Sequence, residues 1–574
     1  MKEGEGRPPE NPVQCASPAS SSSCTVSNAY GSWPDGLSCT AAQVVYPTTE
    51  AQIMAVVAAA VEKKQKMKVV SRYAHSFPKL MCPGSSDGLL ISTRDYNQGL
   101  LIDKDSMTAI ADSGVELRQL LDALAAQGLA LTHSPYWHGV SLGGLLSTGA
   151  HGSSFFGKGA AVHEFVIGMR LVTPASAADG FVKVIELNDT HTPELLNAAK
   201  VSLGVLGVIS KVTLRLESLF KRSITYSLVG DEDLEDQILP FAAAHEFGDV
   251  IWNPSLAKAT YRLDDRVSVD TPGDGVYEFL GFRPASAKLL LEPDRILEEL
   301  QEASDDASGK CVTARVEVAG LQLLGYGLRN SGKPGALFTG FPVIGYHHQL
   351  QASGSCLYTP EGDRRVCPWD PRIRGLFIFQ SAFSIAASKV AAFVGDLKAL
   401  RDRVVEGFCG ADSYLGVYMR FVKASTAYLG KPDDAVDFDV QYYRAREKGR
   451  PRLLEDVMEE VEQMAVFKYG GVPHWGKNRP VAFLGVARKY PQLQRFLAVK
   501  QQLDPDSLFS NDWTEFALGL TASPQPAALY NASGCALEGL CICSQDAHCA
   551  PHLGYLCQPG RVYIQARVCR KVLQ

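Results

Sequence analysis

The alternation of hydrophobic and polar positions predicts alternating strands and helices over the first 220 residues. A helix is expected over residues 48–66, where a cap-like Thr-Thr-Glu precedes apolar residues at helical spacing (Ile53, Val56, Val57 and Val61). Short strands are expected over residues 67–71, 89–92, 166–173 and 212–216, and a second helix over residues 117–126. This order is typical of an α/β or α+β domain at residues 41–220.

The pattern then changes to longer amphipathic strands and helices, with helices expected over residues 387–397 and 453–464. We predict a second, mixed domain over residues 221–520, which includes loop-like segments at 331–335 and between Cys356 and Cys367. Residues 1–40, rich in Pro, Ser and Gly, are expected to form an irregular arm tied to the body by cysteines. Residues 530–574 form a separate cysteine-rich tail.

Composition excludes several classes of protein. The 574 residues are 46% hydrophobic and 21% charged, and 56 Lys and Arg against 62 Asp and Glu give a net charge of −6. The chain is too apolar to be disordered as a whole, and it lacks the basic surface expected of a nucleic-acid-binding protein. The longest apolar run, at residues 53–61, is too short to span a membrane, so no transmembrane segment is expected.

Fourteen cysteines indicate an oxidising compartment. Eight lie between Cys15 and Cys409, and six crowd into the tail: Cys535, Cys541, Cys543, Cys549, Cys557 and Cys569. Both counts are even, so each group is expected to close its own disulfides. Tail spacings such as Cys541-x-Cys543 also leave zinc as an alternative, but they differ from the usual C-x2-C, and no metal is expected.

The cysteines and two glycosylation sequons, at Asn188 and Asn531, favour the secretory pathway, with an extracellular or vacuolar location. The polar start of the chain shows no signal peptide, and we interpret it as a mature or trimmed end.

Two segments are candidates for binding a long phosphate-containing ligand. The first is a strand that enters a tight polar loop, whose backbone N–H groups can surround an anion (Ser71, Arg72, Tyr73, Ala74, His75 and Ser76). The second has four glycines in ten residues, which permits close approach of the backbone (Ser141, Gly143, Gly144, Ser147, Thr148, Gly149, His151, Gly152 and Ser153). It matches neither the G-x-G-x-x-G fingerprint nor a Walker loop.

A third glycine segment, Gly207-Val208-Ile209, precedes a predicted strand. Alone, each of the first and third segments is also compatible with an ordinary turn. Together, the three blocks in this order resemble the FAD-binding domain of the vanillyl-alcohol-oxidase flavoprotein superfamily, the PCMH-type fold.

The resemblance implies an α+β, two-subdomain FAD-binding domain followed by a mixed α/β cap domain over the substrate. It assigns the first loop to the diphosphate, the second to the flavin and ribityl chain, and the third to the adenine half. It also implies a covalent bond between His75 and the flavin 8α-methyl group, although His75 alternatively only lines the site, as in relatives that bind FAD noncovalently.

The sequence Pro473-His474-Trp475-Gly476-Lys477 narrows the branch, because it resembles the His-Trp-x-Lys motif of sugar-lactone and alditol oxidases. Residues 39–49, 148–154 and 534–541 are further similar to plant L-gulonolactone-oxidase-like proteins. The resemblance covers residues 10–570 approximately, including the tail, and implies that the 473–477 segment returns to the flavin.

One position departs from this pattern. Enzymes of this class carry a Glu-x-Arg pair on a cap strand, whereas this chain has Tyr418 and Arg420. Residues 418 and 420 share one face of a strand, so Tyr418 is expected to face the site if Arg420 does.

The resemblance implies oxidation of an aldono-1,4-lactone such as L-gulono-1,4-lactone, as in L-ascorbate biosynthesis. The carbon beside the lactone carbonyl loses hydride to FAD, and O₂ is the acceptor that yields H₂O₂. Lys477 and Arg420 are the expected cationic groups, and His474 and Tyr418 are acid–base or hydrogen-bonding candidates, with His474 the better pKa match. Gly88, where lactone dehydrogenases tend to have Ala, favours an oxidase.

Two alternatives stay open. One is a flavin oxidase of another polyol, aldose or lactone, which Tyr418 makes plausible. The other is an extracellular binding protein that retains a flavin scaffold without catalysis. The oligomeric state is not predicted.

Overall fold

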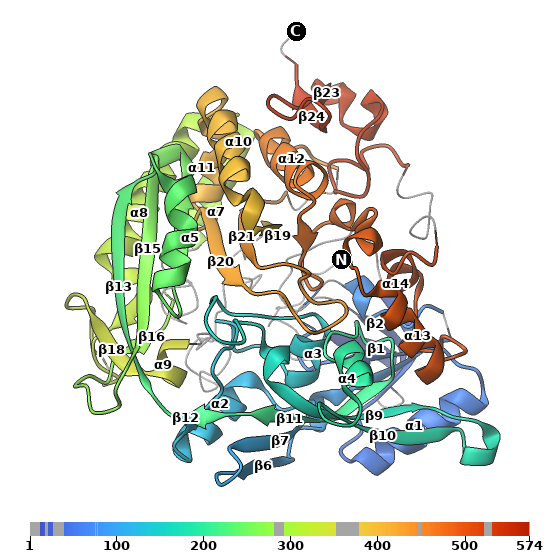
Figure 1. The fold of residues 1–574 in the computed structure, drawn as a ribbon. Helices are drawn as coiled ribbons and strands as arrows, with labels where there is room; N and C mark the ends of the chain where they lie inside the picture. The colour runs from blue at the N-terminus through green and yellow to red at the C-terminus, as the bar shows by residue number, and fades with distance from the viewer. Residues whose placement is uncertain are drawn as a thin grey trace.

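The computed structural model describes residues 12–17, 21–26, 39–279, 292–351, 378–521 and 531–572, apart from residues 75, 77, 86, 334, 446 and 448. His75 and the predicted loop between Cys356 and Cys367 therefore lie outside the described residues. In Figure 1 the first domain, coloured blue to teal, occupies the lower part of the molecule, and the cysteine-rich tail lies at the top, beside α12 (Glu455–Gln463).

The first domain contains two five-stranded sheets. The first sheet has the order β1 (Val13–Ser17), β2 (Ser22–Val26), β3 (Cys39–Val45), β5 (Leu89–Ser92) and β4 (Met67–Val70). The second has the order β10 (Val182–Asn188), β9 (Val166–Pro174), β11 (Val208–Arg215), β7 (Thr108–Asp112) and β6 (Leu100–Asp103), all antiparallel.

Helix α1 (Glu50–Glu62) packs between these sheets. Its Ile53 and Val57 share a core with Leu89 and Ile91 of the first sheet and with Val172 of the second. The helix begins where predicted, because the Thr49 hydroxyl accepts a hydrogen bond from the Gln52 N–H and so caps the first turn. Helix α2 (Leu117–Ala126) has the predicted bounds.

The cap is built on an eight-stranded sheet. Its order is β18 (Val343–Tyr346), β13 (Lys221–Gly230), β15 (Lys258–Val267), β14 (Asp249–Asn253), β20 (Val417–Val422), β21 (Ala435–Tyr443), β19 (Ile378–Ala386) and β22 (Val472–Pro473). Apolar side chains of its central strands pack against four helices: α5 (Leu234–Ala244), α10 (Val390–Arg403), α11 (Glu406–Asp412) and α12.

The opposite face of this sheet is polar. In β21 the apolar Val436, Phe438 and Val440 enter the helix-covered core, whereas the alternate residues Asp437 and Asp439 belong to the other face. The sheet therefore separates a hydrophobic core from a polar surface that faces the first domain, and this division positions the site.

The remaining helices and short strand pairs connect or cover these sheets. They are α3 (Leu142–Ser147), α4 (Pro193–Ala199), α7 (Glu292–Ala303), α8 (Ala307–Leu323), α9 (His347–Gln351), α13 (Leu493–Leu503), α14 (Asp512–Ala517), β8 (Leu129–Ala130) with β12 (Glu217–Ser218), and β16 (Val276–Tyr277) with β17 (Leu328–Arg329).

The chain returns to the first domain after the cap sheet. Trp475, Phe496 and Trp513 pack in the same core as Leu120 and Val212 of the first domain. Residues 475–513 of the predicted cap region therefore pack against the first domain.

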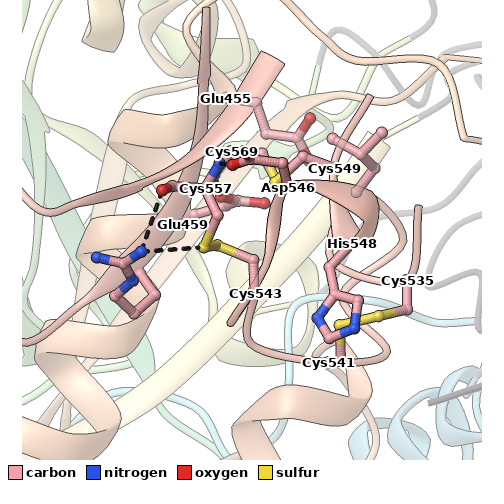
Figure 2. Close-up of a disulfide and its surroundings, with 12 residues drawn as sticks. Glu455, Glu459, Cys535, Cys541, Cys543, Asp546, His548, Cys549, Cys557 and Cys569 are labelled. Carbon is pink, nitrogen blue, oxygen red and sulfur yellow. Dashed lines mark hydrogen bonds between the residues drawn. A yellow bond between two sulfur atoms is a disulfide. The ribbon is translucent and has the colours of Figure 1, made fainter. Parts of the chain in front are cut away.

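The tail is a small unit closed by three disulfides, Cys535–Cys541, Cys543–Cys557 and Cys549–Cys569, as Figure 2 shows. Its hairpin of β23 (Tyr555–Pro559) and β24 (Arg567–Lys571) rests on α12. The predicted pairing within the tail is confirmed, and because every tail sulfur is bonded to another, none is a thiolate that could bind zinc in this form.

The prediction of an irregular N-terminal arm is wrong for residues 13–17 and 22–26. These residues form a hairpin that extends the first sheet, and Cys15 is bonded to Cys24 across it. Cys39–Cys82 ties β3 to the loop before β5, and Cys311–Cys409 ties α8 to α11. Within the described part of the chain, no helix is long and apolar enough to cross a membrane.

We expect Glu460 to hold the tail against the body. Its buried carboxylate accepts hydrogen bonds from the backbone N–H groups of Arg561, Val562 and Tyr563, at 2.6, 2.7 and 2.8 Å. Glu460→Ala leaves three donors without this acceptor and should lower the unfolding free energy by about 3 kcal/mol in urea titrations. The exposed Glu447 provides the control, Glu447→Ala; equal stability of the two variants would contradict this role.

Candidate active site

A cavity of about 690 Å³ lies between the glycine loops of the first domain and the polar face of the cap sheet. It also reaches α7 and α8, where Arg295, Glu298 and Lys310 line it. Most of the sequence-predicted site residues line this one cavity: Ser71, Ala74, Ser76, Ser141, Gly143, Gly144, Ser147, Thr148, His151, Gly207, Ile209, Tyr418, Arg420, His474 and Lys477.

The glycines of the second loop pack closely against neighbouring segments. A Cβ on Gly144 would lie 3.4 Å from the hydroxyl of Ser71 in the first loop, and a Cβ on Gly143 would lie 3.1 Å from the Cβ of Ser113. Larger residues would narrow the cavity between the first and second loops. The Ser147 and Thr148 hydroxyls donate hydrogen bonds to the carbonyls of Gly143 and Gly144, which stabilises the second loop in this shape.

Two hydroxyls in the cavity wall fit a polar cofactor. Ser113 Oγ and Ser141 Oγ are buried and have no hydrogen-bond partner among the described residues. Buried hydroxyls are normally satisfied, so these two are suited to the phosphate or ribityl oxygens of FAD. The close-packed glycines and the free hydroxyls together fit an extended dinucleotide.

The other described candidates do not line the cavity: Arg72, Tyr73, Gly149, Gly152, Ser153 and Val208. Val208 lies between the cavity-lining Gly207 and Ile209 and points into the core, as alternation along β11 requires. The Ser153 hydroxyl donates to the Gly248 carbonyl at 2.5 Å and accepts from the Phe421 N–H at 3.0 Å. Ser153 thus joins the first domain to the cap sheet.

The segment Pro473-His474-Trp475-Gly476-Lys477 divides its side chains between core and cavity. The Trp475 ring stacks on Tyr490 at 5.2 Å, and its Nε1 donates to the Leu429 carbonyl at 2.9 Å. His474 and Lys477 line the cavity instead. Asn478 fixes the end of the segment, because its side chain bonds to both backbone groups of Ala382 in β19.

A compact group of charges lies where this segment meets β20 and β21. Arg420 donates to Asp437 and Asp439 at 3.1 and 3.0 Å, and Lys477 also pairs with Asp439. Lys431 lies 4.0 Å from Asp437. Three cations thus surround two carboxylates, which leaves one excess positive charge in this group, suited to stabilising a negative charge that develops in the cavity.

Burial strongly affects the titration of this group. Burial lowers the pKa of His474 well below its ordinary value, and Lys477 adds to this effect. Burial also raises the pKa of Tyr418 well above its ordinary value. His474 is therefore neutral at physiological pH and a weaker base than the sequence-based prediction of a well-matched pKa supposes.

Gly88 does not support the expected inference about oxygen access. It does not line the cavity, and a Cβ at this position would lie 2.5 Å from the Pro83 Cβ. Packing against Pro83 explains the glycine without any contact with a flavin.

Several residues in or beside the cavity were not predicted from the sequence. Asp439 and Gln441 line it, and Asp437 binds Arg420 next to it. All three form the polar half of the alternating segment Val-Asp-Phe-Asp-Val-Gln, and this pattern could have identified them. Lys68 is buried, and its Nζ donates to the carbonyls of Leu203, Gly204 and Phe509. A lysine within an otherwise apolar strand was the available signal.

Comparisons with known proteins agree with this geometry. Three family models match the chain: an FAD binding domain over residues 41–177, D-arabinono-1,4-lactone oxidase over residues 378–516, and the C-terminal domain of L-gulonolactone oxidase 2-like proteins over residues 532–571. L-gulonolactone oxidase 5 of Arabidopsis thaliana is 50% identical over 98% of this chain and 94% of its own length. The chain belongs to the L-gulonolactone oxidase family.

A second member of the family, L-gulonolactone oxidase 2 of Arabidopsis thaliana, is 49% identical over 98% of this chain and 94% of its own length. A more distant relative, L-gulono-1,4-lactone dehydrogenase of Mycobacterium tuberculosis, is 26% identical over 85% of this chain and 99% of its own length. The predicted resemblance, including its FAD-binding domain, is confirmed.

Solved structures confirm the fold class. A solvent-stable cholesterol oxidase matches with a TM-score of 0.63 and 15% identity, and the match covers 84% of this chain and 96% of the oxidase chain. A chitooligosaccharide oxidase matches with a TM-score of 0.56 and 15% identity, covering 88% and 96%. At this identity the likeness concerns the fold alone.

The buried His151 makes the stability of the folded protein depend on pH. Burial lowers the pKa of His151 from 6.5 to about 3, although Asp437 acts in the opposite direction. Between these values the unfolded chain binds a proton that the folded protein does not, so stability is lost as the pH falls from 6.5 towards 3. Urea unfolding at several pH values measures how the unfolding free energy changes with pH. In His151→Gln this change should be smaller than in the wild type by about 1.4 kcal/mol per pH unit. Parallel slopes for the variant and the wild type would contradict the assignment.

Proposed function

We propose that this protein oxidises an L-gulono-1,4-lactone-like aldonolactone, with FAD as cofactor and O₂ as the acceptor that is reduced to H₂O₂. The observation that carries the proposal is the placement of Arg420 and Lys477 in one cavity with the glycine loops that fit FAD. Bound FAD would supply the hydride acceptor. The names of the relatives support a lactone as the substrate. L-ascorbate biosynthesis remains part of the proposal as what the sequence resemblance implies.

The two cations have different tasks in this proposal. Arg420 is fixed by Asp437 and Asp439, so its planar guanidinium is preorganised to bind a substrate oxygen. Lys477 would supply a point charge that stabilises the negative charge a bound flavin gains on accepting the hydride. The proton of the reacting hydroxyl passes to water or to neutral His474, which burial makes a hydrogen-bonding group rather than a strong base.

A flavin scaffold without catalysis is less compatible with the site. Burying three cations beside two carboxylates carries a large desolvation cost, and a protein that only bound a partner through its tail would not need this arrangement. The family pattern described above has Glu at the position of Tyr418. Because this difference lies in the cavity, other hydroxylated substrates are tested as well.

The disulfides also support passage through the secretory pathway. Asn531 is exposed at the start of the tail and accessible to glycosylation. In contrast, the side-chain oxygen of Asn188 accepts hydrogen bonds from the N–H groups of Thr190 and His191.

The direct test measures peroxide formation by the purified holoprotein with L-gulono-1,4-lactone, L-galactono-1,4-lactone and simple alditols. We expect activity with L-gulono-1,4-lactone and a loss of a hundredfold or more, roughly, in kcat/KM for Lys477→Met. Asp439 keeps Arg420 and Gln380 as partners in this variant, so folding should be retained. The exposed Lys104 provides the control, Lys104→Met. An unaltered rate in Lys477→Met would remove Lys477 from the reaction.

Covalent attachment of the flavin through His75 is a separate part of the proposal. Its support is sequence position, because the neighbouring Ala74 and Ser76 both line the cavity. Acid precipitation of the wild type should give a yellow pellet, whereas His75→Ala should release its flavin into the supernatant or fail to bind it. A colourless wild-type pellet from a yellow native protein would show that the flavin is not covalently bound.

A further inference from the structure

Asp249 is a buried carboxylate directly behind the cavity wall. It lies on β14, opposite Arg262 of the adjacent strand β15, and is 1% exposed. Its Oδ2 accepts hydrogen bonds from Tyr418 Oη, Tyr136 Oη and Arg262 Nη1, each at 2.8 Å. In each of these three bonds the Asp249 oxygen is the acceptor and the tyrosine or arginine is the donor.

The surrounding charges keep this carboxylate balanced. Arg262 also pairs with Asp264, which in turn binds Arg222. Two guanidinium groups therefore face two carboxylates in a buried quartet. Asp249 therefore keeps two partners besides Tyr418, the Tyr136 hydroxyl and the Arg262 guanidinium, and these hold its side chain in place.

The consequence concerns the polarity of Tyr418. A phenol has one proton, and that of Tyr418 is donated to Asp249. Tyr418 lines the cavity. A hydrogen bond between its oxygen and a ligand must therefore have the Tyr418 oxygen as the acceptor. The cavity wall thus offers a hydrogen-bond acceptor at Tyr418 and cationic donors at Arg420.

These two positions match the two ends of a hydroxylated lactone. Residues 418 and 420 are neighbours on one face of β20, roughly 7 Å apart along the strand. Arg420 suits the carbonyl end, and the phenol oxygen suits a hydroxyl further along the molecule, which must donate. A lactone without additional hydroxyls would have nothing to donate to Tyr418.

We propose that Tyr418, oriented by Asp249, is the residue that selects polyhydroxylated lactones by accepting a hydrogen bond from a substrate hydroxyl remote from the reacting carbon. Asp249 is a positioning residue, since it acts through Tyr418 and does not line the cavity. The inference rests on the proposed function for its substrate class.

The test compares two ligands that differ in remote hydroxyls. L-gulono-1,4-lactone carries them, whereas 2-hydroxy-γ-butyrolactone keeps only the ring, the carbonyl and the adjacent hydroxyl. Dissociation constants are measured by calorimetry on the holoprotein after its flavin has been reduced with dithionite in the absence of oxygen, so that each lactone can bind but cannot be oxidised. Tyr418→Phe should weaken binding of L-gulono-1,4-lactone about tenfold and leave that of 2-hydroxy-γ-butyrolactone within about twofold.

Tyr442→Phe is the matched control. Tyr442 lies on the core face of the adjacent strand β21, and its buried hydroxyl has no hydrogen-bond partner among the described residues. The same deletion there should change neither dissociation constant. If Tyr418→Phe weakens both ligands equally, or neither, the inference is wrong.

Asp249→Asn tests the positioning role. It should weaken L-gulono-1,4-lactone binding about threefold in the wild type and have no further effect in Tyr418→Phe, because both changes act on one hydrogen bond. Additive effects would overturn the role of Asp249. Peroxide assays separate this inference from the proposed function: selective binding without peroxide contradicts only the function, and peroxide formation without discrimination by Tyr418 contradicts only the inference.

Discussion

Two buried carboxylates, Asp437 and Asp439, hold together the parts of the protein that meet at the cavity. They bind Arg420 of the adjacent strand, and Asp439 also binds Lys477 from the segment that returns to the first domain. His151, from the second glycine loop, has its Nε2 3.5 Å from Asp437. Loss of either carboxylate would leave a buried cation without its partner, which typically costs 3–5 kcal/mol, roughly.

This arrangement is possible because the cap sheet has two chemically different faces. One face is covered by α5, α10, α11 and α12, and its aromatic and aliphatic side chains provide the cohesion of the cap. The other face can therefore carry charges without losing the core. The tail reinforces the same region: α12 binds the tail through Glu460, and Glu462 of α12 binds Arg479, two residues after Lys477.

Local patterns predicted the glycine loops, the His-Trp-x-Lys segment and the placement of Tyr418 beside Arg420, because close backbone approach and strand alternation leave direct traces in sequence. The partners of these residues were harder to predict. Asp249 is 169 residues from Tyr418, and the two meet only through pairing of β14 with β20. The N-terminal hairpin was missed because its strands lie within Ser- and Pro-rich sequence, where tertiary pairing with β3 outweighs weak local preference.

The depressed pKa of His474 was also beyond sequence reasoning, since burial and the proximity of Lys477 arise only when the chain has folded. The central claim is that the cavity between the glycine loops and the polar sheet face brings an aldonolactone to bound flavin. The most direct measurement is anaerobic addition of L-gulono-1,4-lactone to the holoprotein while the visible flavin absorption is recorded. The absorption should fade on addition of the lactone and return when O₂ is admitted. An unchanged spectrum at saturating lactone would contradict the account.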